Sequence, residues 1–147
     1  MKDRFCKASE WSPSPDFKCV YIPHALKLLT MIEDSPELRR WCSSYWIGEQ
    51  YPDKSELLDE IRWFLHASYA EGLVVTDYGE YLEQMNLRYG IAEDAEASWL
   101  DGLSLNQLLS VMAFHFRKDH HCNGSLINES LASGAMYRIV LELAKRV

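Results

Sequence analysis

No run of apolar residues in the sequence approaches the roughly 18 that a membrane-spanning helix needs. The N-terminal stretch MKDRFCKASEW also lacks the apolar core of a signal peptide. Cysteine is sparse, because Cys6, Cys19, Cys42 and Cys122 are far apart and form no CxxC pair. A small secreted domain would have a higher density of cysteine. We therefore expect reduced thiols in a cytoplasmic protein that does not contact membranes.

The short motifs that accompany common catalytic and cofactor sites are also missing. The sequence contains no HExxH, no GxSxG, no phosphate-binding Walker loop and no GxGxxG. We accordingly predict no bound metal, no cofactor and no catalytic residue, and we favour a binding protein over an enzyme.

Basic residues are scarce in one segment, from Glu71 to Asp101. It has eight acidic residues and one base, Arg88, which gives the segment the same net charge of -7 as the whole chain. Such a charge disfavours direct binding to nucleic acid. Helical spacing places Glu80 beside Glu83, and Glu93 beside Glu96. These four residues are candidates for contact with a basic protein surface, and a merely solvated acidic face is the alternative.

Helix start and stop signals are frequent after residue 20. Ser35 followed by Pro36 predicts a helix start, as do Ser104 and Gln107 with the spacing of a capping box. Gly134 predicts a left-handed helix end. Alternating Ser and Pro in SPSPDF indicate an extended arm before these helices. We predict an all-α, compact single-domain bundle of about seven helices, with an irregular N-terminal arm over residues 1–20 and a helical domain over residues 21–147.

Two stretches of the chain resemble a known family. The first is DYGEY, from Asp77 to Tyr81, and the second is LNQLLSVMAFHFRKDHHCNGSLINESLASGAMYRIVLEL. Together they resemble the bacterial proteins grouped as domain of unknown function 6508, over about residues 72–146. The residues that match this pattern are Arg117, Asp119, Gly124, Leu126, Ser133 and Gly134, whereas His120 and His121 depart from it. The resemblance implies a helical fold and no established activity.

The run FRKDHHCNG is the densest group of reactive side chains. On a continuing helix, His115, Asp119 and Cys122 would share one face and could bind zinc, although His and Lys are also common at the end of a helix. We favour the helix end. Arg117 and His120 belong to the strongest basic spot of the chain.

The resemblance suggests a second candidate site, a pocket shared by residues of the two matching stretches. Its expected lining is Asp77, Tyr81, Arg117 and Asp119, and a helix-capping role for Asp77 is the alternative.

The sequence favours a small acidic helical binding or regulatory protein that acts through macromolecular contacts. Inhibitors encoded by mobile elements, of the anti-defence or anti-CRISPR type, belong to this class. The expected partner is a protein with a basic surface. The alternative is an enzyme or small-ligand-binding domain that uses the pocket around Asp77 and Arg117. The oligomeric state is not predicted.

Overall fold

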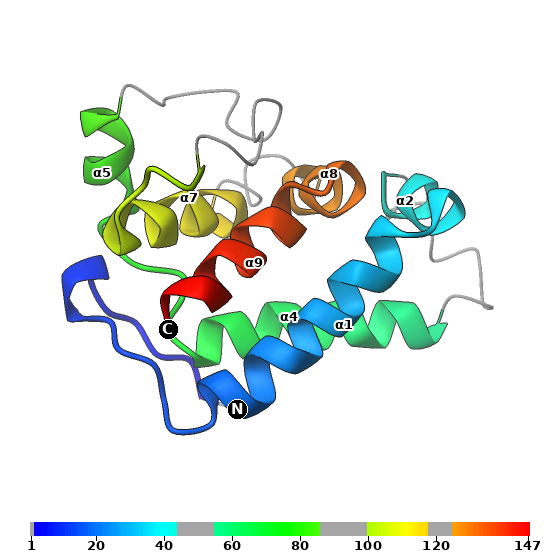
Figure 1. The fold of residues 1–147 in the computed structure, drawn as a ribbon, viewed down its shortest axis with the longest axis horizontal. Helices are drawn as coiled ribbons and strands as arrows, with labels where there is room; N and C mark the ends of the chain where they lie inside the picture. Colours follow the sequence, from blue (N-terminus) through cyan, green and yellow to red (C-terminus); the bar gives the residue numbers. More distant parts are fainter. Residues whose placement is uncertain (1, 44–54, 86–99, 118–124) are drawn as a thin grey trace.

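The computed structural model describes residues 2–43, 55–85, 100–117 and 125–147 (Figure 1). The fold is all-α, as predicted, and the described residues form seven α-helices, two short helices of other types and no strand. None of these helices has the length and apolar character needed to cross a bilayer. The elements are η1 (Ala8–Glu10), η2 (Phe17–Tyr21), α1 (Ile22–Glu33), α2 (Pro36–Ser43), α4 (Ser55–Ala70), α5 (Tyr78–Gln84), α7 (Leu105–Arg117), α8 (Ser125–Ser133) and α9 (Ala135–Arg146).

Local start signals fix several of these helices. Pro23 stands in the first turn of α1, where its missing N–H leaves no helical hydrogen bond unmade. The Ser35 hydroxyl accepts a hydrogen bond from the Leu38 N–H at 3.2 Å, and α2 begins at the next residue, Pro36. The buried face of α1 consists of Ile22, Ala25, Leu28, Leu29 and Ile32, the last four of which the helical spacing predicts.

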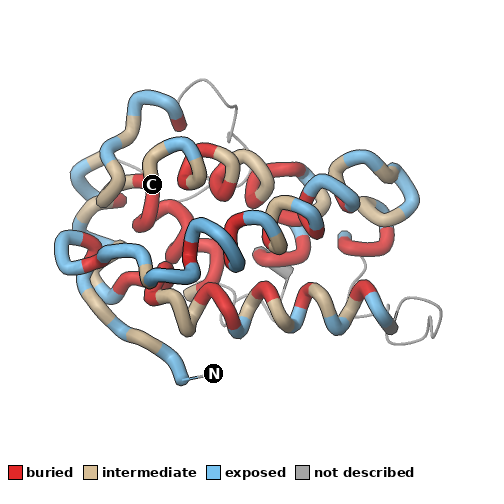
Figure 2. The backbone as a smooth tube through the Cα atoms, turned by 60° about the horizontal axis from the view of Figure 1, so that its bottom comes forward, coloured by how far each residue is buried: buried red, intermediate tan, exposed pale blue. Residues whose placement is uncertain are grey.

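Helix α7 lies at the centre of the fold. Its predicted capping box is confirmed, because the Ser104 N–H donates to Gln107 Oε1 at 2.8 Å and the Gln107 N–H donates to Ser104 Oγ at 3.2 Å. Every residue from 108 to 116 is buried. Buried and exposed positions alternate along the outer helices in Figure 2, whereas α7 is enclosed by α5, α8, α9 and η1. A helix that is apolar on all sides must be covered on all sides.

Because η2 begins at Phe17, within the span predicted for the N-terminal arm, the name is kept from here on for residues 2–16. This arm packs against the C-terminal end of α4. The last carbonyls of a helix have no partner within it. Here the Arg4 N–H donates to the Tyr69 carbonyl at 3.1 Å, and Trp11 Nε1 donates to the Glu71 carbonyl at 2.8 Å. Trp11 and Ala8 are buried in the same core as the helices. The arm therefore caps α4, and the division into an arm and a separate helical domain stays a prediction.

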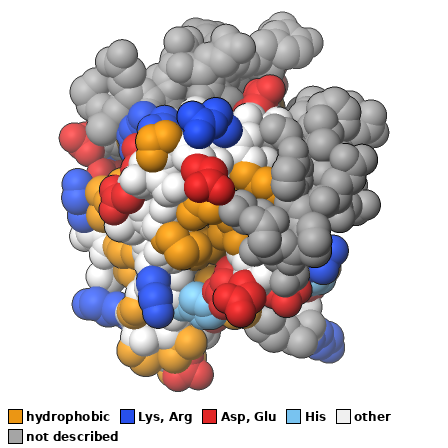
Figure 3. Space-filling view, turned by 90° about the vertical axis from the view of Figure 1, so that its right-hand side faces the viewer, with side chains coloured by type: hydrophobic (Ala, Val, Ile, Leu, Met, Phe, Trp, Pro, Cys, Tyr) orange, Lys and Arg blue, Asp and Glu red, His pale blue; other side chains and the backbone are white. Residues whose placement is uncertain are grey.

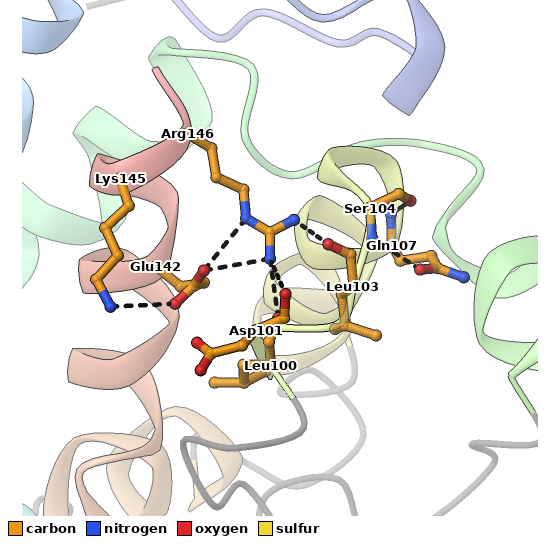
Figure 4. Close-up of polar contacts among 8 residues, drawn as sticks. All are labelled: Leu100, Asp101, Leu103, Ser104, Gln107, Glu142, Lys145 and Arg146. Carbon is orange, nitrogen blue, oxygen red and sulfur yellow. Dashed lines mark hydrogen bonds and ion pairs between the residues drawn. The ribbon is translucent and has the colours of Figure 1, made fainter.

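The C-terminal turn of α9 is fastened to the turn before α7 (Figure 4). The Arg146 guanidinium donates to the Leu100 carbonyl at 2.9 Å and the Asp101 carbonyl at 3.2 Å, as well as to the Leu103 carbonyl. It also pairs with Glu142 at 3.2 Å. A hydrogen bond with Asp101, and then the one with Arg146, hold the pKa of the Glu142 carboxyl below its usual range. Arg146, paired with Glu142, therefore connects the end of α9 to the turn before α7.

Gly134 forms the turn between α8 and α9 with φ of 84°, the left-handed conformation that the sequence predicts. A Cβ atom at this position would lie 2.5 Å from Glu33 Oε2. We expect Gly134→Val to lower the free energy of unfolding by about 2 kcal/mol, since a β-branched residue is strained at positive φ. Urea denaturation measures this loss.

Gly79 provides the matched control for that substitution. It lies in α5, at negative φ, and a Cβ there would meet nothing within 4 Å. Gly79→Ala should stabilise the protein slightly, by up to about 1 kcal/mol, because alanine is the better helix former. An unchanged denaturation midpoint in Gly134→Val would contradict the strained turn.

Candidate functional site

Two of the four residues expected to line a pocket, Asp77 and Arg117, contact the N-terminal arm. Asp77 Oδ1 accepts a hydrogen bond from the Ala8 N–H at 2.8 Å. The Arg117 guanidinium lies over the Phe5 ring, 5.8 Å from its centroid, in a cation–π contact. Neither a hydrogen bond nor an ion pair joins Asp77 to Arg117 in the described structure. Both side chains hold the arm, and their role in binding a partner stays a prediction.

The alternative role for Asp77, as a helix cap, is wrong. Asp77 does stand at the N-cap position of α5, but its side chain makes no capping hydrogen bond there. The carboxylate instead accepts a hydrogen bond from the Ala8 N–H of the arm. A contact between residues far apart in the chain thus replaces the local one.

The other predicted binding residues are distributed differently. The Tyr81 hydroxyl accepts a hydrogen bond from Asn106 Nδ2 at 3.3 Å, which joins α5 to α7. Glu80 and Glu83 are exposed on α5, as an acidic contact face requires. The remaining predicted residues, Glu93, Glu96, Asp119 and His120, lie outside the described residues.

The zinc hypothesis depends on His115 together with Asp119 and Cys122. His115 is fully buried, with Nδ1 donating to the Val111 carbonyl at 2.9 Å. Asp119 and Cys122, its expected co-ligands, are outside the described residues, and the described part of the chain contains no group of three side chains suited to a metal. Burial raises the pKa of the Cys42 thiol to about 12, so this thiol is a poor nucleophile.

The structure contains an open groove that the sequence did not indicate. It has a volume of about 670 Å³ and lies between α1, α2 and the first turns of α4. One wall is α1, which contributes His24, Lys27 and Met31 from its outer side and the buried Leu28. The opposite wall is α4, with Glu56, Leu57, Asp59 and Glu60, and α2 contributes Leu38. Figure 3 shows this face, with hydrophobic side chains gathered at its centre and acidic side chains and a histidine beside them.

The groove has an apolar floor and a charged rim. Leu28 and Leu57 are buried, whereas Met31 keeps 45% of its surface exposed, one of the largest exposures of any described hydrophobic residue. All three charged groups on the α4 side are carboxylates, and Lys27 is the cation on the α1 side. An exposed apolar surface bordered by carboxylates along one side is suited to contact with a macromolecule.

One end of the groove is shaped by a histidine. His24 Nε2 lies 2.5 Å from Glu60 Oε2, and the imidazole ring stacks on Trp63 with 3.5 Å between the ring centroids. Both side chains of this contact are partly exposed, so it contributes little to stability. Its effect is to hold the His24 ring flat against α4 at the edge of the groove.

Sequence reasoning missed the groove because its residues come from three helices. Met31 is the one local signal, since it lies off the buried stripe of α1, three residues after Leu28. A single exposed methionine is nevertheless common on helices and indicates no site by itself.

The fold and the groove define a small all-α protein with an open, surface-exposed candidate site. The chain belongs to the family of unknown function (DUF6508), whose model matches residues 46–147. The match confirms the resemblance and begins further upstream than the two stretches that indicated it, so that it includes α4. The arm, α1 and α2 precede the matched residues. No curated protein and no solved structure matches the chain.

Proposed function

We propose that this protein is a small helical binding protein that acts by docking onto a protein with a basic surface. The observation that carries the proposal is the groove between α1, α2 and α4, whose apolar floor is bordered on one side by Glu56, Asp59 and Glu60. Burial of apolar surface supplies affinity, and complementary charge supplies steering and specificity. The net charge of -7 favours the same kind of partner over nucleic acid. Inhibitors, including those carried by mobile elements, and adaptors share this binding step.

The alternative function, an enzyme or ligand-binding domain built on Asp77 and Arg117, has less support. A substrate would need both side chains to be available. The Asp77 carboxylate accepts the Ala8 N–H, and the Arg117 guanidinium covers the Phe5 ring. A ligand at this place would have to displace the arm, together with its hydrogen bonds to α4.

Affinity purification from the cell that encodes the protein tests the proposal. We expect a specific partner whose capture falls steeply between about 0.05 M and 0.5 M salt, because exposed charges are screened over this range. A partner that is captured equally at both salt concentrations would contradict a basic surface. Capture of nucleic acid alone would contradict the proposal as a whole.

The exposed acids of α5 are tested in the same experiment. If they add to the acidic surface, Glu80→Lys/Glu83→Lys should reduce capture of the partner. The control is Asp34→Lys/Glu129→Lys, which changes the net charge equally at two exposed positions, the C-cap residue of α1 and a residue of α8. Equal capture by both variants would remove α5 from the binding surface.

A further inference from the structure

We infer that the groove between α1, α2 and α4 receives an amphipathic helix of the partner protein, which directs basic side chains toward α4. This inference rests on the proposed function and specifies the element of the partner that is bound.

The dimensions of the groove suit a short helical segment. His24, Lys27 and Met31 follow one another at intervals of three and four residues, so they form one line along the outside of α1. Seven residues of helix span roughly 10 Å, about two turns. On the other wall, Glu56 and Glu60 are one turn apart on α4. The groove thus runs alongside about two turns of α1 and about one turn of α4.

The backbone of the groove walls favours a helix over an extended peptide. A peptide that binds by strand addition needs a free strand edge with which to form hydrogen bonds, and the described residues contain no strand. The walls are helices, and beyond the first turn of α4 their backbone groups are already paired within each helix. A helical ligand satisfies its own backbone and needs only side-chain contacts. Apolar side chains one turn apart would then rest on Leu28 and Leu57, and the flexible Met31 would adapt to them.

The charges of the rim determine the orientation of the helix. Asp59 pairs weakly with Arg62 at 3.7 Å, between two exposed side chains, and Glu60 faces His24. Glu56 has no basic partner among the described residues. The α4 wall can therefore accept basic side chains of the ligand, whereas Lys27 disfavours them on the α1 wall. Phosphate groups beside three carboxylates would be repelled, which excludes nucleic acid as the occupant.

A pair of synthetic peptides tests the inference on the full chain. Both peptides form amphipathic helices with the same leucine face, and they carry either Lys or Glu along one edge. We expect the Lys peptide to bind at least about tenfold more tightly than the Glu peptide, with an affinity that falls as salt rises. Amide resonances of α1 and the first turns of α4 should shift on binding. Equal affinities of the two peptides, or shifts located elsewhere, would overturn the inference.

Substitutions at exposed positions locate the binding surface without disturbing the core. Met31 is 45% exposed inside the groove, and Val20 is 55% exposed but does not line it. Met31→Lys should weaken binding of the Lys peptide by about tenfold or more, and Val20→Lys by less than about twofold. Similar losses in the two variants would indicate nonspecific adhesion and would overturn the inference.

The result for the partner separates this inference from the proposed function. If the Met31→Lys variant still captures the partner, with the salt dependence of the parent, the proposed function stands and the groove is excluded as the binding site. A small molecule that co-purifies in place of a protein, and is lost in Met31→Lys, would overturn both.

Discussion

Replacing Trp11 by alanine is expected to lower the free energy of unfolding by about 3–5 kcal/mol, the usual range for truncating a buried tryptophan. Trp11 is only 7% exposed, and its ring meets the edge of Phe17 with 5.3 Å between the ring centroids. Its Nε1 also donates to the Glu71 carbonyl at 2.8 Å, next to the end of α4. The substitution removes the apolar contact and the hydrogen bond together. Urea denaturation followed by circular dichroism measures the change.

Two further variants separate these contributions. Trp11→Phe keeps most of the apolar contact and removes the N–H, so it should cost about 1 kcal/mol for the lost hydrogen bond, more if the smaller ring leaves a cavity. Phe5→Ala, at a ring that is 57% exposed, should cost less than about 1 kcal/mol. If Trp11→Ala were as mild as Phe5→Ala, the arm would not belong to the cooperatively folded unit.

Acid is expected to destabilise the protein through His115. Burial lowers the pKa of this side chain from 6.5 to about 4, and the hydrogen bond with Val111 opposes the shift only in part. The folded protein therefore keeps His115 neutral between these two pH values, while the unfolded chain takes up a proton. Stability is complete above about pH 6.5 and falls as the pH decreases toward 4, by about 3 kcal/mol in total for this group.

A His115→Phe variant isolates this contribution. Phenylalanine is close to histidine in shape and cannot take up a proton, and the Nε2 atom that it removes has no hydrogen-bond partner in the folded protein. Stability of the variant should fall less between pH 6.5 and 4 than that of the parent. His66→Gln, at an exposed position of α4, serves as the control and should keep the pH dependence of the parent. Identical slopes for His115→Phe and the parent would assign the acid sensitivity to other groups.

The helices were predictable from the sequence because their signals act within a few residues. The capping box of Ser104 and Gln107 joins positions three residues apart, and the Ser35 hydroxyl reaches Leu38 over the same interval. The left-handed Gly134 follows from the steric freedom of one residue. Such interactions depend little on the rest of the fold, so the fold class and most of the helix boundaries could be predicted from the sequence.

The contacts of the candidate site could not be predicted in the same way. Asp77 was expected to meet Arg117 or to cap its own helix, yet its partner is Ala8, 69 positions earlier in the chain. Every residue except proline has a backbone N–H, so the sequence does not show which residue donates such a hydrogen bond. The groove is equally invisible, because Met31, Leu38 and Leu57 become neighbours only when three helices pack together.

The capping of α4 by the arm has a consequence for the order of folding during synthesis. The arm is synthesised before α4, and the carbonyl groups that it binds are added more than sixty residues later, since Arg4 is bonded to Tyr69. Trp11 and Phe17 have no completed surface on which to pack until α4 and the following turn have emerged. Contacts of such large sequence separation form slowly, because a long loop must close before they are made. Docking of the arm is therefore among the late steps in folding, and the nascent chain exposes these two aromatic side chains until it occurs.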